Sequence, residues 1–222
     1  MKNKWAVIFD LDGTLLDTYD DLANAINHML TKYNYPTRNR QEIRRFLGNG
    51  ARDLVCRSLP GGVDGDTVEQ FLEEYKVYYN AHSQINTKPY DGVIEVLKTL
   101  RSRGIATAVV SNKPDLAVRG LCAHYFDGTV DFAIGDRPGI ERKPSGDPII
   151  FAIKELGCDR AIYVGDSEVD IEAAKNACLP CVSVTWGFRD LDVLEESGGY
   201  IFADDSSQLE RKLFELIELG DN

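Results

Sequence analysis

From residue 91 onward, hydrophobic positions along the chain alternate between two patterns. Apolar residues recur at helical spacing in "DGVIEVLKTLRSRG", a helix that we expect to begin at a capping Asp91 and to end at Gly104. The next segment, "IATAVVS", is mainly apolar and is typical of a strand buried on both faces, ending at Ser111. Further helices are predicted in "PDLAVRGLCAHYF", "DPIIFAIKELG", "VDIEAAKNA" and 207–219, and further strands in "VDFAIG", "AIYVGD" and "CVSVT". This alternation predicts an α/β fold with a doubly wound parallel sheet.

Residues 17–88 interrupt the alternation. They follow a first apolar strand at 5–9 and contain two amphipathic helices, "YDDLANAINHMLTKY" and "TVEQFLEEYKVYY". A further helical stretch at 41–59 is broken by "GNGAR". The apolar stripes of the two amphipathic helices are Leu22, Ile26, Met29 and Tyr33 in the first and Val68, Phe71, Leu72, Tyr75 and Tyr79 in the second. We therefore expect an α/β core at 1–16 and 89–222 with a helical domain inserted at 17–88.

Composition and charge narrow the class of partner. The chain has 222 residues, 43% of them hydrophobic, which is enough to bury a sizeable core. A net charge of −11 repels polyanions, so we expect no nucleic-acid or membrane partner, and any anionic substrate must meet local positive charge. The apolar runs are too short to span a bilayer and the N-terminus lacks a secretory apolar region, which predicts a cytoplasmic protein. Among the five cysteines, Cys178 and Cys181 are close together, but no second pair completes a metal site, so all five are expected to be small buried hydrophobic residues.

The first strand ends in "DLDGT", with two carboxylates one residue apart. Asp10 should lie at the carboxyl end of the strand, where parallel α/β sheets form their ligand sites. Asp10 and Asp12 can both be ionised only if a cation or hydrogen-bond donors offset their repulsion. Gly13 permits a sharp turn, and the Thr14 hydroxyl can hold a neighbouring side chain. Taken alone, either acid is more often a turn residue or a helix cap.

Polar residues also follow the later strands. They are Ser111 and Asn112, Lys143 in the loop "GIERKPSG", and Asp166 with Asp170. Each has an ordinary alternative: a helix cap for Ser111 and Asn112, a solvated loop charge for Lys143, and a first-turn acid for Asp170. Their occurrence at successive strand ends favours one shared pocket. Lys113 either assists phosphate binding or is a surface residue.

The combined set is suited to phosphoryl transfer. Asp10 can attack phosphorus and form an acyl phosphate, while Asp12 can act first as acid toward the leaving oxygen and then as base toward water. Mg²⁺ prefers oxygen ligands and would be held by Asp10 and Asp166. The Ser111 hydroxyl and the Lys143 ammonium can hold the phosphate oxygens on which charge develops.

These motifs resemble those of the haloacid dehalogenase superfamily of hydrolases over essentially the whole chain. "DLDGT" resembles the first motif, "VVSN" the second, the lysine of "ERKPSGDP" the third and "YVGDSEVD" the fourth. The resemblance implies that Asp10 is the nucleophile, that Asp12 is the acid and base, and that Asp10, the Asp12 backbone carbonyl and Asp166 bind the metal. Asp170 matches the second acid of the fourth motif. The presence of Asp12 favours a phosphate over a haloacid substrate, because the dehalogenases proper lack it.

The 17–88 insertion resembles the helical cap of this superfamily. Within it, "FLGNGARDLVCRSL" is similar to the G-x-G-x-x-x-L cap loop of phosphoglycolate phosphatases. Gly48 and Gly50 would let the backbone approach a substrate, whose carboxylate Asn49 and Arg52 would hold. In the alternative, the glycines only bend the helix and Arg52 faces solvent. The resemblance implies a Mg²⁺-dependent phosphatase that hydrolyses a small phosphorylated metabolite through an aspartyl-phosphate. The expected substrate is 2-phosphoglycolate, and the protein is expected to be a monomer or a homodimer.

Two positions depart from the family pattern, and other functions stay open. The third motif more often reads KPxPxP, whereas Gly146 and Asp147 interrupt it here, and Cys178 stands where a helix-ending glycine is usual. Pyrophosphatase, sugar-phosphate phosphatase and β-phosphoglucomutase are alternatives within the superfamily. Phosphonoacetaldehyde hydrolysis would need a Schiff-base lysine, and none of Lys32, Lys76 and Lys88 lies in a recognisable motif. A phosphoreceiver signalling module would lack the helical insertion, and a P-loop nucleotidase would need GxxxxGK[ST], which is absent from the sequence.

Overall fold

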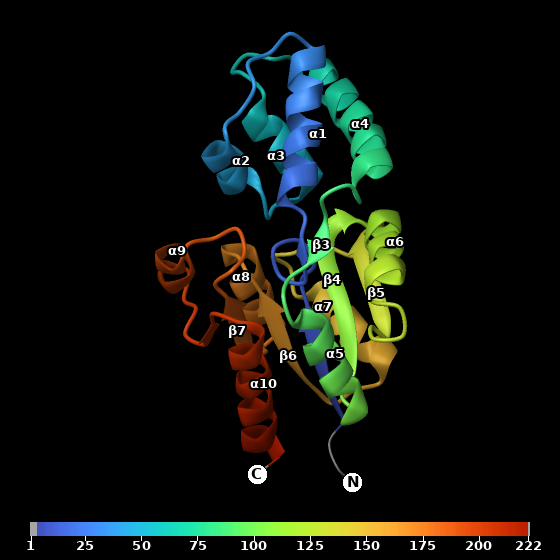
Figure 1. The fold of residues 1–222 in the computed structure, drawn as a ribbon, viewed down its shortest axis with the longest axis vertical. Coiled ribbons are helices and arrows are strands. Elements are labelled where there is room, and N and C mark those ends of the chain that lie inside the picture. Colours follow the sequence, from blue (N-terminus) through green and yellow to red (C-terminus); the bar gives the residue numbers. More distant parts are fainter. Residues whose placement is uncertain (1–3, 222) are drawn as a thin grey trace. The chain divides into compact units, whose positions relative to one another are not determined.

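The computed structural model describes residues 4–221 and divides the chain into two compact units (Figure 1). The α/β unit comprises the described parts of Met1–Leu16 and Pro89–Asn222, and the helical unit comprises Asp17–Lys88. Two short strands, β2 (Leu16–Asp17) and β3 (Lys88–Pro89), form a two-stranded sheet at the two points where the chain passes from one unit to the other.

The α/β unit is built on a six-stranded sheet with the order β5-β4-β1-β6-β7-β8, in which neighbouring strands are parallel. Its strands are β1 (Trp5–Phe9), β4 (Ala106–Pro114), β5 (Phe132–Asp136), β6 (Arg160–Gly165), β7 (Cys181–Val184) and β8 (Phe202–Ala203). All five residues of β1 are buried, as expected for a central strand that is covered on both faces. The predicted doubly wound parallel sheet is confirmed.

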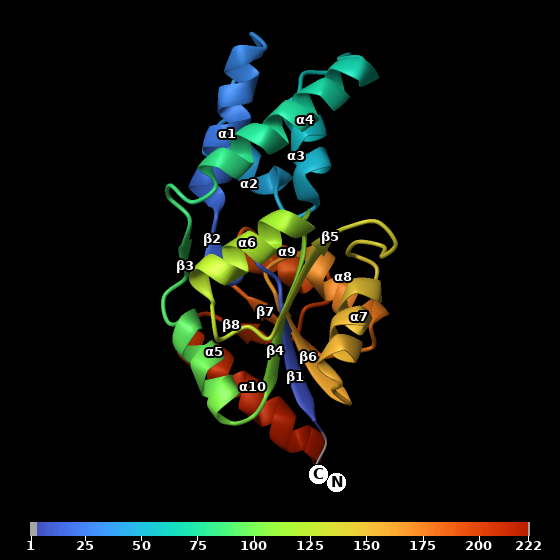
Figure 2. The same ribbon diagram turned by 90° about the vertical axis from the view of Figure 1, so that its right-hand side faces the viewer.

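Successive side chains of β1 serve two hydrophobic cores. The helices of this unit are α5 (Val93–Ser102), α6 (Asp115–Tyr125), α7 (Asp147–Leu156), α8 (Glu168–Asn176), α9 (Leu191–Glu196) and α10 (Ser206–Asp221). Trp5, Val7 and Phe9 pack into a core with α5, α6 and α10, whereas Ala6 and Ile8 pack into a second core with α7, α8 and α9. Figure 2 shows α5 and α10 on one side of the sheet and α7 and α8 on the other.

Two of the predicted boundaries in the α/β unit are wrong. Asp91 does not cap α5, because the N-cap is Gly92, which has φ +79° and lies so close to the Ser206 side chain that a Cβ would overlap it. Strand β4 does not end at Ser111 but continues to Pro114, past a register shift in its pairing with β5. The short elements α9, β2, β3 and β8 have no counterpart among the predicted elements.

The helical unit contains α1 (Tyr19–Lys32), α2 (Arg40–Phe46), α3 (Gly50–Ser58) and α4 (Gly65–His82). Most of the two predicted apolar stripes is buried, whereas Tyr33 and Val68 are only half-buried. The break between α2 and α3 falls at "GNG", where Gly48 has φ +104° and Gly50 has φ +81°. Positive φ at these two positions explains why glycine suits the break.

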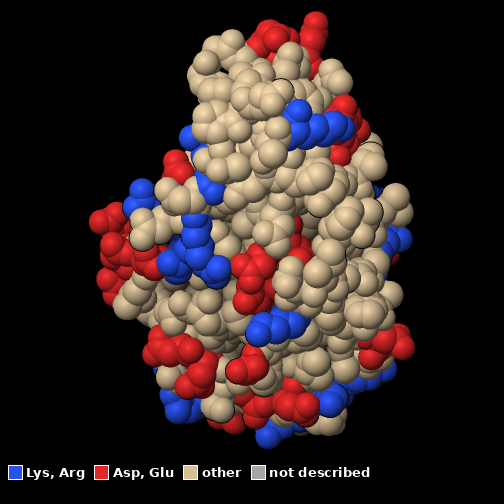
Figure 3. Space-filling model, turned by 45° about the horizontal axis from the view of Figure 1, so that its top comes forward, with Lys and Arg blue, Asp and Glu red and all other residues tan. Residues whose placement is uncertain are grey.

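Three further expectations concern the cysteines and the surface. All five cysteines are free, but only Cys122 and Cys181 are buried and Cys158 is partly so. The prediction of burial is wrong for Cys56 and Cys178, which are exposed. Among the described helices, none has the length and apolar character that crossing a membrane requires. On the face drawn in Figure 3, basic side chains stand in small groups among acidic ones.

Candidate active site

Asp10 follows β1 directly and is 7% exposed. Its backbone N–H donates to the Val164 carbonyl oxygen at 2.8 Å, so the sheet pairing with β6 extends to this residue. The chain then turns at Gly13, which has φ +88° and where a Cβ would overlap the Asp166 carboxylate. The Thr14 hydroxyl donates to Asp166 Oδ1 at 3.3 Å. The loop after β1 therefore brings the first motif against the fourth.

Lys143 links the nucleophile candidate to the fourth motif. Its Nζ lies 2.7 Å from Asp10 Oδ1, 2.8 Å from Asp170 Oδ1 and 2.9 Å from Tyr163 Oη. Only 3% of the residue is exposed, so the solvated-loop alternative is wrong. Burial lowers the pKa of Lys143, but the carboxylates of Asp10 and Asp170 raise that pKa by more, to a value above the ordinary one. The ammonium therefore stays charged and holds the Asp10 carboxylate in a fixed position.

The two acids of the fourth motif have different surroundings. Asp166 Oδ2 accepts a hydrogen bond from the Phe188 backbone N–H at 2.7 Å. Asp170 is the third residue of α8, and its Oδ2 accepts from the Ser167 N–H at 3.1 Å and from the Ser167 hydroxyl at 2.6 Å. It is thus a first-turn acid that also binds Lys143. Because both of its oxygens already accept strong hydrogen bonds, Asp170 is better suited to hold the lysine than to ligate a metal.

The second motif lies within the extended part of β4. Asn112 Nδ2 donates to the Lys143 carbonyl oxygen at 3.0 Å, and the Ser111 hydroxyl oxygen accepts from the Lys113 N–H at 3.3 Å. The helix-cap alternative is wrong for this pair, because the N-cap of α6 is Pro114. Lys113 is also not a surface residue: it is 6% exposed, and its Nζ lies 2.9 Å from Asp12 Oδ2. The acid and base candidate therefore has its own lysine.

The Gly146 departure in the third motif has a local cause. A Cβ at Gly146 would lie 2.7 Å from the backbone nitrogen of Ala177, closer than real contacts allow. The same approach of the Lys143 loop to the end of α8 lets Asn176 Nδ2 donate to the Pro144 carbonyl oxygen at 2.8 Å. Glycine thus allows the loop to pack against α8, and Lys143 keeps its contacts with the acids.

The buried charges fit a divalent cation. Carboxylate oxygens of Asp10, Asp166 and Asp170 all lie within 4.8 Å of one another. Burial, opposed by Lys143 and reinforced by Asp170, raises the pKa of Asp10 to about 7. Burial, followed by the charges of Asp170 and Asp10, raises the pKa of Asp166 well above its usual value. With Asp12 included, four carboxylates face two lysines, so full ionisation leaves two negative charges for a cation to balance.

Two buried oxygens also fit a ligand at this place. Asp12 Oδ1 and Asn112 Oδ1 are buried, and neither has a hydrogen-bond partner among residues 4–221. Buried polar atoms are nearly always paired, so these two oxygens indicate where a bound group would find acceptors. Oxygen donors of this kind suit a hard cation such as Mg²⁺ rather than a soft metal.

Several site residues were not predicted. Tyr163 lies in the middle of β6, fully buried, with its hydroxyl 3.0 Å from Asp170 Oδ1. The only available signal was a polar tip in an otherwise apolar strand. Phe188 contributes only its backbone N–H, which no side-chain pattern can indicate. Glu168 and Arg189 form a salt bridge beside Asp166 through two short contacts of 2.6 and 2.9 Å.

The predicted specificity residues lie together in the helical unit. Asn49 is the N-cap residue of α3, and Gly48 and Gly50 flank it. The Arg52 guanidinium already binds a carboxylate: its Nη1 lies 2.8 Å from Glu69 Oε2, and its Nη2 lies 2.5 Å from Glu69 Oε1. Both side chains are about half exposed. A substrate carboxylate would therefore compete with Glu69 for Arg52.

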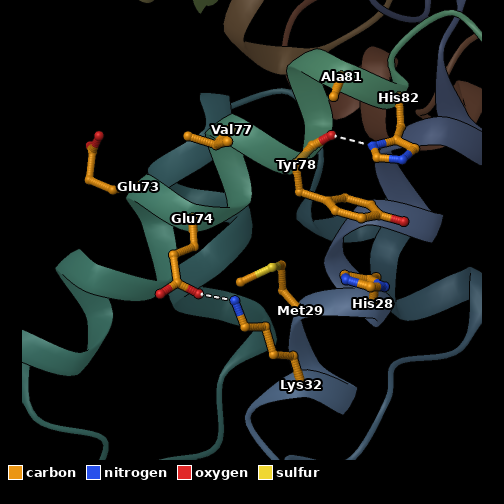
Figure 4. Close-up of a pocket in the computed structure, with 9 residues that line it drawn as sticks. All are labelled: His28, Met29, Lys32, Glu73, Glu74, Val77, Tyr78, Ala81 and His82. Carbon is orange, nitrogen blue, oxygen red and sulfur yellow. Dashed lines mark hydrogen bonds and ion pairs between the residues drawn. The ribbon is translucent and has the colours of Figure 1, made fainter.

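A separate hollow of about 460 Å³ opens between α1 and α4 of the helical unit (Figure 4). Tyr78 stacks on His28 at a ring-centroid distance of 3.9 Å and on His82 at 4.0 Å, and Lys32 pairs with Glu74 at 2.8 Å. The hollow is lined by His28, Met29, Lys32, Glu73, Glu74, Val77, Tyr78, Ala81 and His82. None of the predicted site residues is among them.

The sequence and the fold both match known proteins. The profile of the haloacid dehalogenase-like hydrolases matches residues 7–184. A phosphoglycolate phosphatase from Pseudomonas putida is 35% identical over 190 residues, covering 82% of this chain and 70% of that protein. One from Agrobacterium fabrum is 33% identical over 220 residues, covering 95% and 92%. A structure from Lactobacillus delbrueckii subsp. bulgaricus, named as a candidate phosphoglycolate phosphatase, has a TM-score of 0.90 and 36% identity, covering 96% of this chain and 99% of that one. The chain therefore belongs to the haloacid dehalogenase-like hydrolases.

Proposed function

We propose that this protein is a Mg²⁺-dependent phosphatase that hydrolyses 2-phosphoglycolate through an aspartyl-phosphate on Asp10. The observation that carries the proposal is a buried group of four carboxylates and two lysines, in which Lys143 binds Asp10 and Lys113 binds Asp12. When all four carboxylates are ionised, this group has two excess negative charges, which a divalent cation would balance. The names of the relatives from Pseudomonas putida and Agrobacterium fabrum support the choice of substrate.

Asp10 is oriented for attack by the lysine beside it. Its Oδ1 is bound to Lys143, so Oδ2 forms the bond to phosphorus while the ester bond to the leaving oxygen breaks. Mg²⁺, held by Asp10, Asp166 and the Asp12 backbone carbonyl, would neutralise charge on the phosphate when bound. Ser111, Asn112 and the Lys143 ammonium are the proposed partners of the phosphate.

Asp12 moves the protons in both half-reactions. Its carboxyl proton passes to the leaving oxygen in the first step, which yields glycolate from 2-phosphoglycolate. In the second step, the Asp12 carboxylate takes a proton from water as the water oxygen attacks phosphorus, which releases phosphate and restores Asp10. Positioned proton transfer of this kind contributes about 10²- to 10⁴-fold in rate. Lys113 Nζ, which lies 2.9 Å from Asp12 Oδ2, stabilises the carboxylate that the first step leaves on Asp12.

The test is a panel of substrates assayed for phosphate release with Mg²⁺ and with EDTA. The panel contains 2-phosphoglycolate, pyrophosphate, sugar phosphates and p-nitrophenyl phosphate. We expect continuous turnover, the highest kcat/KM for 2-phosphoglycolate, loss of activity in EDTA and recovery with Mg²⁺. Full activity of metal-free protein would overturn the metal assignment, and preference for another substrate would favour the corresponding alternative. A single retained phosphate without turnover would indicate a phosphoreceiver.

Two variants separate the roles of the first-motif acids. Asp10→Asn should form no phosphoenzyme detectable by mass spectrometry after exposure to a substrate with a good leaving group. Asp12→Asn should retain metal binding and lose about 10² to 10⁴ in rate, because only proton transfer is removed. A phosphoenzyme in Asp10→Asn protein would show that another residue is the nucleophile.

We further propose that Arg52, with Asn49, holds the carboxylate of the substrate. Losing one charge-assisted contact costs about 1.5–3 kcal/mol, so Arg52→Ala should reduce kcat/KM for 2-phosphoglycolate by about 10- to 150-fold and spare p-nitrophenyl phosphate. Glu69→Gln should improve 2-phosphoglycolate turnover, because it removes the competing carboxylate. Arg57→Ala is the matched control, since Arg57 lies on the same helix, pairs with Asp53 at 2.8 Å and donates to the Arg45 carbonyl oxygen at 3.2 Å. Equal losses for both substrates in Arg52→Ala would assign Arg52 to folding instead.

A further inference from the structure

The segment "TWGFRD" at 185–190, which follows β7, contacts Asp166. The Phe188 N–H donates to Asp166 Oδ2 at 2.7 Å, and Trp186 Nε1 donates to the Thr14 carbonyl oxygen at 3.1 Å. Gly187 lies so close that a Cβ there would overlap both the Asp166 side chain and the Gly13 carbonyl oxygen. The segment therefore touches the first and the fourth motifs at once.

Arg189 anchors this segment to the helix that follows Asp166. Its Nε lies 2.6 Å from Glu168 Oε2 and its Nη2 lies 2.9 Å from Glu168 Oε1, a two-point contact that fixes the plane of the guanidinium. Arg189 is 7% exposed. Since Glu168 comes two residues after Asp166 and Arg189 one residue after Phe188, the salt bridge fixes the chain on both sides of the Phe188–Asp166 hydrogen bond.

We propose that Arg189 and Glu168 are positioning residues for the metal ligand Asp166. Their salt bridge keeps the Phe188 N–H on Oδ2 and thereby sets the direction in which Asp166 presents its other oxygen, which the Thr14 hydroxyl also touches. This inference rests on the proposed function, because it takes Asp166 as a ligand of Mg²⁺. A direct role of Arg189 toward the substrate is disfavoured, because the guanidinium is buried and occupied by Glu168.

The charge of Arg189 and Glu168 alone predicts a different Mg²⁺ affinity for the variants than the positioning role does, so measured affinities distinguish the two. Arg189→Met removes a positive charge beside the site, so electrostatics alone would tighten Mg²⁺ binding, and Glu168→Gln would weaken it. The double variant Arg189→Met/Glu168→Gln changes net charge by zero and would leave binding unchanged. Positioning predicts weaker binding in all three variants, because each one breaks the salt bridge.

The experiment is calorimetric titration of the full-length protein with Mg²⁺ alone, at fixed pH and ionic strength, without substrate. We expect Kd for Mg²⁺ to rise about tenfold in all three variants. This is the lower end of the loss in metal affinity that usually follows mutation of a residue that orients a metal ligand. Arg189→Lys, which can keep one of the two contacts, should have an intermediate Kd. Arg101→Met is the control, because it removes the Arg101–Asp131 salt bridge (2.9 Å) elsewhere in the α/β unit and should leave Kd unchanged.

The unfolding midpoint of each metal-free variant shows whether it is folded, and the half-exposed Glu168 provides a mild variant if Arg189→Met does not fold. Tighter binding in Arg189→Met, or unchanged binding in the double variant, would overturn the positioning role and leave the proposed function intact. If the unaltered protein does not bind Mg²⁺, the proposed function fails and this inference fails with it.

Discussion

Replacing Asp21 by Asn tests what holds the last segment of the helical unit onto α1. The Asp21 carboxylate lies in the first turn of α1 and is 3% exposed. Its Oδ2 accepts hydrogen bonds from the backbone N–H groups of Ile85 at 3.1 Å, Asn86 at 3.0 Å and Thr87 at 2.9 Å, and from the Thr87 hydroxyl at 2.8 Å. Oδ1 accepts from Asn86 Nδ2 at 2.8 Å and from the Asn86 N–H at 3.0 Å. One carboxylate thus fixes three consecutive residues.

The expected cost follows from these contacts. Hydrogen bonds to a charged group contribute about 1.5–3 kcal/mol each and neutral ones about 0.5–1.5 kcal/mol. In Asp21→Asn, the remaining oxygen can keep the partners of Oδ2 as neutral hydrogen bonds, whereas the new amide cannot accept from Asn86, which is exposed and can turn to solvent. Loss of charge on several bonds should lower the free energy of unfolding by about 2–4 kcal/mol.

The loss of unfolding free energy in Asp21→Asn should become smaller as the pH falls. Burial raises the pKa of Asp21, but the hydrogen bonds from Asn86 and Thr87 lower that pKa by a larger amount. The net effect is a pKa below the usual value of an aspartate. In the unfolded chain the pKa of Asp is about 3.9. A carboxyl whose pKa is lower in the folded state stabilises fully above about pH 4, and this contribution disappears as pH falls through the folded pKa. The difference in stability between the unaltered protein and Asp21→Asn should therefore be full at pH 7 and narrow toward pH 3.

Urea unfolding at pH 7, 5 and 3 measures this difference, and hydrogen exchange at residues 85–87 shows where protection is lost. Asp20→Asn is the matched control: it makes the same charge change in the same helical turn, but Asp20 is 55% exposed and pairs with an exposed Arg40. Such surface pairs contribute at most about 1 kcal/mol. An equal loss in both variants, or a loss in Asp21→Asn that does not narrow in acid, would refute the reasoning.

Three further predictions concern the α/β unit. Cys178→Gly should raise the free energy of unfolding by about 0.5–1 kcal/mol and Tm by about 1–4 °C, because Cys178 has φ +57°; an unchanged Tm would show that the αL conformation carries no strain. Gly13→Ala should weaken Mg²⁺ binding in calorimetry while circular dichroism stays native, because the added Cβ overlaps Asp166; normal binding would mean that the loop can shift. Tyr163→Phe should cost about 1–2 kcal/mol in urea unfolding, because the buried hydroxyl bonds Lys143; no loss would show that the hydroxyl contact contributes nothing net.

The alternation of strands and helices could be predicted because burial on both faces leaves a strand continuously apolar and because helix ends follow local chemistry. The end of α7 at Gly157, which has φ +58°, is such a local feature. The start of α5 was missed because a tertiary contact with Ser206, distant in sequence, selects Gly92 as the N-cap. Two-residue strands such as β8 have no period, so no pattern along the chain can indicate them.

Some residues of the site could likewise be predicted from the sequence, whereas others depend on tertiary contacts. The acids and Lys143 could be proposed as site residues because they follow successive buried strands of a parallel sheet, whose carboxyl ends lie along one edge. Whether Lys113 faces the site or solvent could not be decided, because a register shift between β4 and β5 extends the strand past Ser111 and changes where later side chains lie. The contribution of Phe188 was hidden for another reason, since every residue except proline has the same backbone N–H.

The strand order explains why these distant residues meet. The chain passes from β1 to β4 and β5 on one side of the sheet and then to β6, β7 and β8 on the other, so the direction of winding reverses at β1. Ligand sites of open α/β sheets form where the order reverses, because the connections diverge there and leave a crevice over the strand ends. Asp10 follows this central strand, with Lys113 on β4 to one side and Asp166 after β6 to the other. In a protein with a net charge of −11, this strand order brings two lysines into contact with the acids at one point.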